Sequence, residues 1–169
     1  MAVYTRINQG DLSLIEQTFN TGKILSFSGI KKGIENTNYL IRTKNKKIIL
    51  TIFEKRVQKK DLPFFMDLMF GLSRQKIKCP EPIRNKQGKY LFKIKNKTAC
   101  LVSFLEGKDK INLTNKDCYF VGKNAALLHI AAKKLRIHRK NSLSVNSWGP
   151  LLNRIDKRIN KLSDNLINI

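Results

Sequence analysis

The order of the predicted elements indicates an α+β protein in which a small antiparallel sheet is followed by helices. All segments with strand character lie between residues 24 and 104, and one apolar helical segment, 61–75, interrupts them. After residue 107 the sequence contains helical patterns alone. Strands grouped early and helices grouped late are typical of α+β proteins. We therefore predict a five-stranded antiparallel sheet with a helix across it, followed by the first helices of a helical region.

The first elements follow from hydrophobic periodicity. Residues 9–20 place Leu12, Ile15 and Phe19 at three- and four-residue spacing, which predicts a short helix that ends before Gly22. Three segments rich in β-branched or apolar residues then predict strands: 24–28, a strand through 39–43, and 48–53.

The helix over residues 61–75 is expected to start at Asp61 as a cap, and Pro63 is tolerated in its first turn. Its buried face is predicted to consist of Phe64, Phe65, Leu68, Met69 and Leu72. Segments 89–94 and 98–104 predict a hairpin with residues 95–97 at its tip.

The residues after 107 are predicted to form mainly helices. Thr114 with Asp117 three residues later is typical of a capping box that opens a helix. Residues 133–147 are expected to form an irregular basic loop. A last helix is predicted from about Pro150, and its apolar residues are Leu151, Leu152, Ile155, Ile159, Leu162 and Leu166.

The composition is strongly basic. Thirty-four Lys and Arg against twelve Asp and Glu give a formal net charge of +22 over 169 residues. Such a charge suits a nucleic-acid-binding protein, because Lys and Arg displace counterions from phosphates. The charges are dispersed, however, and Lys, Asn and Ile are abundant in every loop. We therefore favour compositional drift from an AT-rich coding sequence over a nucleic-acid site.

Other features weigh against a membrane or secreted protein. No apolar run reaches the roughly 18–20 residues that a spanning helix requires, and residues 1–6 do not open a secretory signal. Cys79, Cys100 and Cys118 are far apart and odd in number, so neither a disulfide framework nor a zinc site is indicated. We expect a cytoplasmic protein.

Three segments are candidates for ligand binding. Gly29 and Gly33 bound a turn between two strands, where backbone N–H groups can bind anionic oxygen, although an ordinary hairpin turn is the alternative. Asparagine is poor in strands, so the polar run 35–38 favours a ligand-facing role. The break at 105–107 is either a hinge or a simple strand end. Lys55 beyond the third strand is either a phosphate-binding cation or a surface charge.

Seven segments, in this order, carry a family resemblance: SFSGIKKGIENTNY (26–39), ILTIFEKRV (49–57), DLPFF (61–65), CPEP (79–82), VSFLEG (102–107), LLH (127–129) and NSLSV followed by Trp148 (141–148). Together they resemble the bacterial homoserine kinases of the aminoglycoside-phosphotransferase superfamily. The resemblance runs from residue 1 to about residue 152.

The resemblance implies a protein-kinase-like fold with an amino-terminal lobe (1–104), a hinge (105–107) and the beginning of a helical lobe (108–169). It implies transfer of the γ-phosphoryl group of ATP to the hydroxyl of L-homoserine, with Mg²⁺, in threonine biosynthesis. The residues that it assigns to nucleotide binding are Gly29, Gly33, Glu35, Asn36, Asn38, Lys55, Ser103, Phe104 and Leu105.

Two departures limit what the resemblance implies. Related kinases place a phosphate-binding lysine on the third strand, where this chain has Thr51, so either Lys55 replaces that lysine or the cation is lost. The catalytic loop H-x-D-x-x-x-x-N and the later metal-binding aspartate are not in the sequence. We therefore expect no catalytic residue or metal ligand in this chain, and negligible activity of the chain alone.

The same absence has a structural consequence. Apolar residues of the last helices, such as Ile155 and Ile159, are expected to need a partner, which a second chain could supply. A split gene, a frameshift and an incomplete gene model would each produce this arrangement. A different small-alcohol kinase of the superfamily and a small basic nucleic-acid-binding protein are the alternative functions.

Overall fold

The computed structural model describes residues 3–55, 57–142 and 144–159. Contacts divide the chain into two compact units, with the boundary between Ile137 and His138. The first unit contains the sheet and its helices, and the second contains the helix α4 (Val145–Ile159). The candidate site lies wholly in the first unit.

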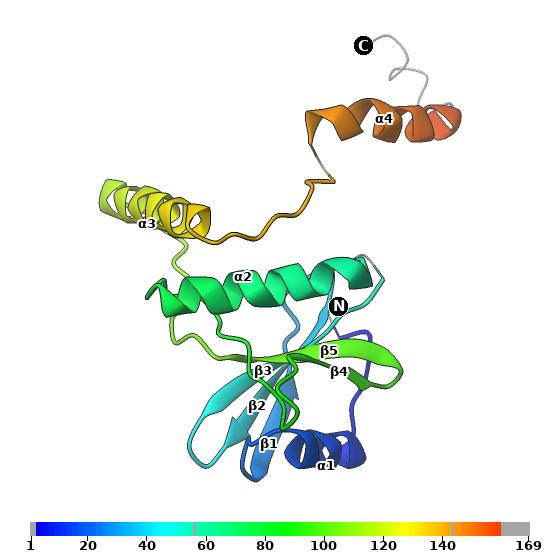
Figure 1. Ribbon diagram of the computed structural model, residues 1–169, viewed down its shortest axis with the longest axis vertical. Helices are drawn as coiled ribbons and strands as arrows, with labels where there is room; N and C mark the ends of the chain where they lie inside the picture. Colours follow the sequence, from blue (N-terminus) through cyan, green and yellow to red (C-terminus); the bar gives the residue numbers. More distant parts are fainter. Residues whose placement is uncertain (1–2, 56, 143, 160–169) are drawn as a thin grey trace. The chain divides into compact units, whose positions relative to one another are not determined.

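A single antiparallel sheet organises the first unit (Figure 1). Its strands are β1 (Ile24–Gly29), β2 (Thr37–Thr43), β3 (Lys47–Ile52), β4 (Leu91–Ile94) and β5 (Lys97–Ser103). They lie in the order β1-β2-β3-β5-β4, and every neighbouring pair is antiparallel. The predicted five-stranded sheet and the α+β class are confirmed.

The helix α1 (Gln9–Thr18) packs against one face of the sheet. Asn8 and Asp11 form a reciprocal capping box that fixes where the helix starts. The apolar stripe predicted from the sequence is buried against the sheet, with Ile15 and Phe19 in one cluster with alternate residues of the strands. These strand residues are Tyr39, Ile41, Ile48, Leu50, Ile52, Ala99 and Leu101.

The other face is covered in part by the helix α2 (Leu62–Arg74), which follows the short 3₁₀ helix η1 (Lys59–Asp61). Met66 of α2 is buried against Cys100 and Val102 of β5. The prediction that the Asp61 side chain caps this helix is wrong, since it makes no capping hydrogen bond. Its backbone is already helical because η1 precedes it, whereas a capping side chain needs an extended backbone.

Two local details differ from the sequence prediction. The hairpin turn between β4 and β5 has only Lys95 and Asn96 at its tip, both with positive φ (49° and 60°), as a two-residue type I′ turn requires. Lys97 already belongs to β5. The polar run 35–38 is only half in a strand, because β2 begins at Thr37.

The helix α3 (Asn115–Lys133) begins with the predicted capping box of Thr114 and Asp117. It joins α2 through a hydrogen bond from Gln75 Nε2 to the Ala131 carbonyl (3.0 Å). Most of its apolar side chains are exposed within the described structure: Tyr119, Phe120, Val121, Leu127, Leu128 and Ile130.

The helix α4 starts earlier than predicted. It begins at Val145 and contains Pro150 in its interior, whereas the sequence placed its start near that proline. An interior proline removes one helical hydrogen bond and crowds the carbonyl four residues earlier, so Pro150 is unfavourable at this position although the helix continues past it. Leu162 and Leu166, which were expected to extend its apolar face, lie outside the described residues.

A polar network ties the amino-terminal segment to the sheet. The Glu54 carboxylate accepts hydrogen bonds from the hydroxyls of Thr5 and Thr37, each at 2.7 Å. Lys97 forms an ion pair with Glu54 and donates to the Thr5 hydroxyl at 2.7 Å. The Glu54 side chain is only 9% exposed. Burial alone would raise its pKa, but the hydrogen bonds from Lys97 and the threonines outweigh burial and lower the pKa below its ordinary value.

Replacement of Glu54 by Gln is expected to destabilise the protein by about 1–3 kcal/mol at neutral pH, because hydrogen bonds to a charged group are lost. Since the folded-state pKa of Glu54 is depressed, its contribution is present above the unfolded pKa and is lost as the pH falls through the folded pKa. Urea unfolding from neutral to acidic pH measures this loss. The control Asp67→Asn changes an exposed carboxylate of α2. A pH profile of Glu54→Gln that superposes on the wild-type profile would contradict the prediction.

Candidate functional site

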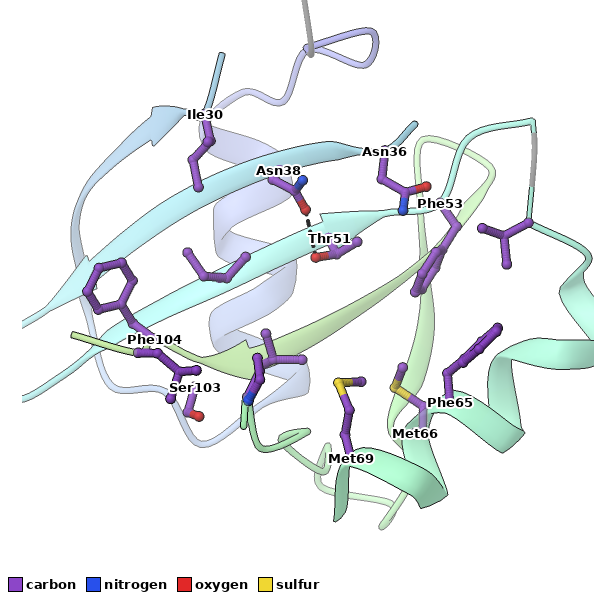
Figure 2. Close-up of a pocket in the computed structure, with 15 residues that line it drawn as sticks. Ile30, Asn36, Asn38, Thr51, Phe53, Phe65, Met66, Met69, Ser103 and Phe104 are labelled. Carbon is purple, nitrogen blue, oxygen red and sulfur yellow. Dashed lines mark hydrogen bonds between the residues drawn. The ribbon is translucent and has the colours of Figure 1, made fainter. Parts of the chain in front are cut away.

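A cavity of about 590 Å³ lies between the sheet and α2 (Figure 2). β2 and β3 form its floor, and Phe65, Met66 and Met69 of α2 face them from the other side. The remaining lining residues are Ile30, Asn36, Asn38, Ile49, Thr51, Phe53, Val57, Pro80, Val102, Ser103, Phe104 and Leu105. The cavity therefore joins the glycine-bounded turn after β1 to the segment that leaves β5.

Uncharged side chains line this cavity, and most of them are apolar. Ile49, Val102 and Met69 offer flat apolar contacts of the kind that an aromatic ring system fits. The polar groups are few and gather at two places, the asparagines of the β2 region and the segment after β5. A planar heterocycle with a polar edge is the ligand chemistry that such a lining suits.

The end of β5 and the two residues after it line the cavity. The Ser103 N–H donates to the Glu81 carbonyl and the Glu81 N–H donates to the Ser103 hydroxyl, each at 2.9 Å, which fixes where the strand ends. Phe104 still donates to the Lys47 carbonyl, at 3.4 Å. In the part of the chain that the structure describes, Leu105 forms no backbone hydrogen bond, so its N–H and C=O can bond to a ligand.

Lys47 contacts two residues of the segment after β5. Its ammonium group lies 2.6 Å from the Glu106 carboxylate and 5.1 Å from the centre of the Phe104 ring. The ion pair is partly exposed, so each contact is worth at most about 1 kcal/mol. Together the two contacts fix the direction in which the chain leaves the sheet.

The glycine-bounded turn lies above the cavity. Ile30 donates to the Asn38 carbonyl at 2.8 Å and lines the cavity. Gly33 has a φ of 113°, which an L side chain rarely adopts, so glycine is required there. A Cβ on Gly29 would lie 2.9 Å from a methyl group of Val3, so the glycine allows the amino-terminal segment to approach.

The residues assigned to nucleotide binding fall into three groups. Five of them line the cavity together: Asn36, Asn38, Ser103, Phe104 and Leu105. Gly29 and Gly33 bound the turn that carries Ile30. Glu35 and Lys55 line a separate hollow of about 390 Å³, together with Tyr4, Ile34, Glu54 and Lys97.

Sequence reasoning missed much of the lining. Ile49 and Phe53 were assigned to a buried strand, but β3 alternates, so that Ile49 and Thr51 line the cavity, as does Phe53 just beyond the strand. Phe65 and Met69 were predicted on the apolar face of their helix, and that face turns out to form one wall of the cavity. The period-two pattern of the strand was the signal that could have separated the two faces.

The described residues bring together no group of three or more His, Cys, Asp or Glu side chains that could hold a metal ion. Among them, none of the helices combines the length and the apolar character that crossing a bilayer requires.

Comparisons with known proteins match most of the chain. A family model described as the phosphotransferase enzyme family matches residues 26–166. The homoserine kinase of Allorhizobium ampelinum is 40% identical over 166 residues, which cover 98% of this chain and 52% of the relative. That of Agrobacterium fabrum is 39% identical with the same coverage, 98% and 52%. That of Parvibaculum lavamentivorans is 40% identical over 151 residues, 89% of this chain and 47% of the relative. The chain spans about half the length of these curated relatives.

Solved structures match the fold. A spectinomycin phosphotransferase in complex with ADP and spectinomycin aligns with a TM-score of 0.62 at 17% identity, covering 92% of this chain and 48% of that one. The AMP-bound complex of spectinomycin phosphotransferase aligns with a TM-score of 0.54 at 18% identity, covering 95% and 57%. These likenesses confirm the kinase-like fold, and the relatives confirm the resemblance drawn from the sequence motifs.

Replacement of Lys47 by Met is expected to loosen the segment after β5. Loss of the ion pair and the cation–π contact should speed amide hydrogen exchange at the hydrogen-bonded N–H groups of Ser103 and Phe104 by about three- to tenfold. Hydrogen-exchange mass spectrometry of peptides over residues 103–107 measures this rate. The matched control is Lys44→Met, which changes an exposed lysine of the turn between β2 and β3. Equal rates in the wild type and Lys47→Met would show that Lys47 does not hold the segment.

Proposed function

Because the chain belongs to the phosphotransferase enzyme family, we propose that it forms the nucleotide-binding lobe and the first helices of a homoserine kinase. This enzyme would transfer the γ-phosphoryl group of ATP to the hydroxyl of L-homoserine, a step of threonine biosynthesis. The observation that carries the proposal is the uncharged cavity between the sheet, α2 and the segment 103–105. We assign residues 1–104 to the nucleotide-binding lobe, 105–107 to the hinge and 108–169 to the beginning of the helical lobe.

The adenine base of ATP fits the hinge side of the cavity. Leu105 offers an N–H and a C=O for the polar edge of the base, while Ile49, Val102 and Met69 offer apolar contacts to its two faces. The turn between Gly29 and Gly33 would then cover the phosphates, as a glycine-rich hairpin does in protein kinases. Lys55 and Glu35 lie in the neighbouring hollow, so we place them at the edge of the phosphate site.

L-Homoserine is proposed as the acceptor because relatives about 40% identical bear the name homoserine kinase. The chain spans about half of their length, so the acceptor would also contact residues outside this chain. Another small-alcohol kinase of the same superfamily is the second candidate. Its support is the likeness in fold to a spectinomycin phosphotransferase.

Magnesium is the cofactor that this reaction class uses to bind the phosphates and stabilise their charge. Among the described residues no Asp or Glu lines the cavity, so the residues that line it do not fit a magnesium site, which uses one or two carboxylates together with the phosphates. The sequence also contains no H-x-D-x-x-x-x-N segment. We propose that the metal ligands and the catalytic aspartate belong to the half of the relatives' length that this chain does not span.

The exposed apolar side chains of α3 support the same division. Tyr119 and Phe120 lie on one turn of the helix and Leu127 and Ile130 on later turns, and all four are exposed. A helix that is apolar on several sides is normally buried in a larger protein. We propose that these residues pack against the remaining half of the kinase, supplied by the same polypeptide or by a second chain.

We propose a cytoplasmic location, where ATP and a free amino acid are both available. The three cysteines are free thiols, which suits a reducing compartment. The alternative of a nucleic-acid-binding protein rests on the net charge of +22 alone. In a kinase the same charge would attract the anionic nucleotide.

Nucleotide binding and polyanion binding can be separated by titration of the 169-residue chain with ADP and with a DNA duplex at several salt concentrations. We expect saturable ADP binding that excess duplex does not displace, because the cavity recognises the base. A polyanion site would instead give DNA affinity that falls steeply with salt. DNA binding of that kind without any ADP binding would favour the alternative function.

The chain alone is expected to have negligible kinase activity, because it lacks the aspartate that orients the acceptor hydroxyl. An assay of ADP release with ATP, Mg²⁺ and L-homoserine measures this, with the Agrobacterium fabrum relative run in parallel as the active control. Homoserine-dependent turnover at a rate comparable to the control would refute the proposed division of function.

A further inference from the structure

Asn38 and Thr51 lie directly opposite each other on β2 and β3. The Thr51 hydroxyl donates a hydrogen bond to Asn38 Oδ1 at 2.8 Å, and the pair forms part of the cavity floor (Figure 2). Because the amide oxygen is bound by Thr51, the orientation of the whole carboxamide is fixed. The Asn38 NH₂ group is therefore directed away from Thr51.

The side-chain amide of Asn36, two residues before Asn38, is also bound through its oxygen. Its Oδ1 accepts a hydrogen bond from the Glu54 backbone N–H at 3.4 Å. Neither the Asn36 nor the Asn38 NH₂ group donates to another group within the described residues. The cavity therefore contains two amide groups whose oxygens face the protein and whose donors are available.

The NH₂ groups of Asn36 and Asn38 belong to a cavity that is lined, among the described residues, by uncharged side chains. Ser103 and Phe104 lie at one end of the cavity, while Asn38 lies on β2 and Asn36 lies farther from Phe104 (Figure 2). A nucleotide with its base at the hinge would extend its phosphates toward the asparagines. Phosphate oxygens need donors, and among the residues that the structure describes no Lys or Arg side chain lines this cavity.

We propose that Thr51 is a positioning residue that turns the Asn38 amide toward a phosphate oxygen of the bound nucleotide. The lobe then holds this oxygen with a neutral donor at the strand position opposite Thr51. This inference rests on the proposed nucleotide-binding function. It goes further by assigning the contact to the phosphate and by making it depend on the Thr51 hydroxyl.

The test is titration of the full chain with ADP and with adenosine, which lacks phosphate, at about 150 mM ionic strength to limit non-specific attraction. Thr51→Val removes the hydroxyl and keeps the shape, and it should weaken ADP binding by about three- to tenfold. Adenosine binding should change by less than about twofold. Thr51→Ser retains the hydroxyl and should bind ADP like the wild type.

Asn38→Asp provides a second variant with a sharper effect. The carboxylate can still accept from Thr51, but it has no donors and repels phosphate, so ADP binding should weaken by more than about tenfold. The control Thr98→Val alters a threonine of the same sheet that does not line the cavity. Thermal unfolding of every variant shows whether it is folded.

The outcomes separate the two proposals. Equal losses for ADP and adenosine, or unchanged ADP affinity in Thr51→Val and Asn38→Asp, would overturn the role of the Asn38–Thr51 pair while leaving nucleotide binding intact. A wild-type chain that binds neither ADP nor adenosine would overturn the proposed function, and this inference with it.

Discussion

The two-sided character of β3 is the constraint on which the rest of the structure depends. Ile48, Leu50 and Ile52 have no exposed surface, because they are buried against α1. Since side chains alternate along a strand, their burial forces Ile49 and Thr51 to face the cavity on the other side. A slip of one residue would place Thr51 in the apolar core and remove its pairing with Asn38, so the hydrophobic core fixes the geometry of the site.

Charge is distributed around the cavity rather than inside it. Lys47 pairs with Glu106 beside the hinge, and Lys97 pairs with Glu54 beyond the far end of β3. In both places a cation is held by a carboxylate and fixes a chain segment, so it acts on structure. The cavity itself recognises a ligand through apolar surface, backbone groups and amides. Under the proposed function, such a site would position the nucleotide, and neutralisation of its phosphates during transfer would need groups from elsewhere.

The sequence was sufficient for the features that depend on local pattern. The five antiparallel strands, the stripe of α1 and the capping box at Thr114 follow from periodicity and short-range hydrogen bonds, whereas the pairing of β3 with β5 was not predicted. It failed where a neighbour in space decides. Asp61 does not cap α2 because η1 precedes the helix, and Glu54 contacts Thr5 across 49 positions of the chain. The same holds for the residues that line the cavity. The sequence motifs indicated Asn38 and Ser103, but they did not indicate that α2 lines the cavity.

The distribution of burial distinguishes the part of the chain that forms the cavity from the helix α3. The core between the sheet and α1 is closed, with Ile15, Ile41 and Leu101 fully buried, and it needs no further element. The helix α3 differs, because Tyr119 and Ile130 remain exposed after all described contacts are made. The parts that form the cavity are thus held by the closed core and by α2, while the apolar surface of α3 still requires a partner. Under the proposed function, nucleotide binding would therefore depend on the strands and α2, and phosphoryl transfer would depend on what covers α3.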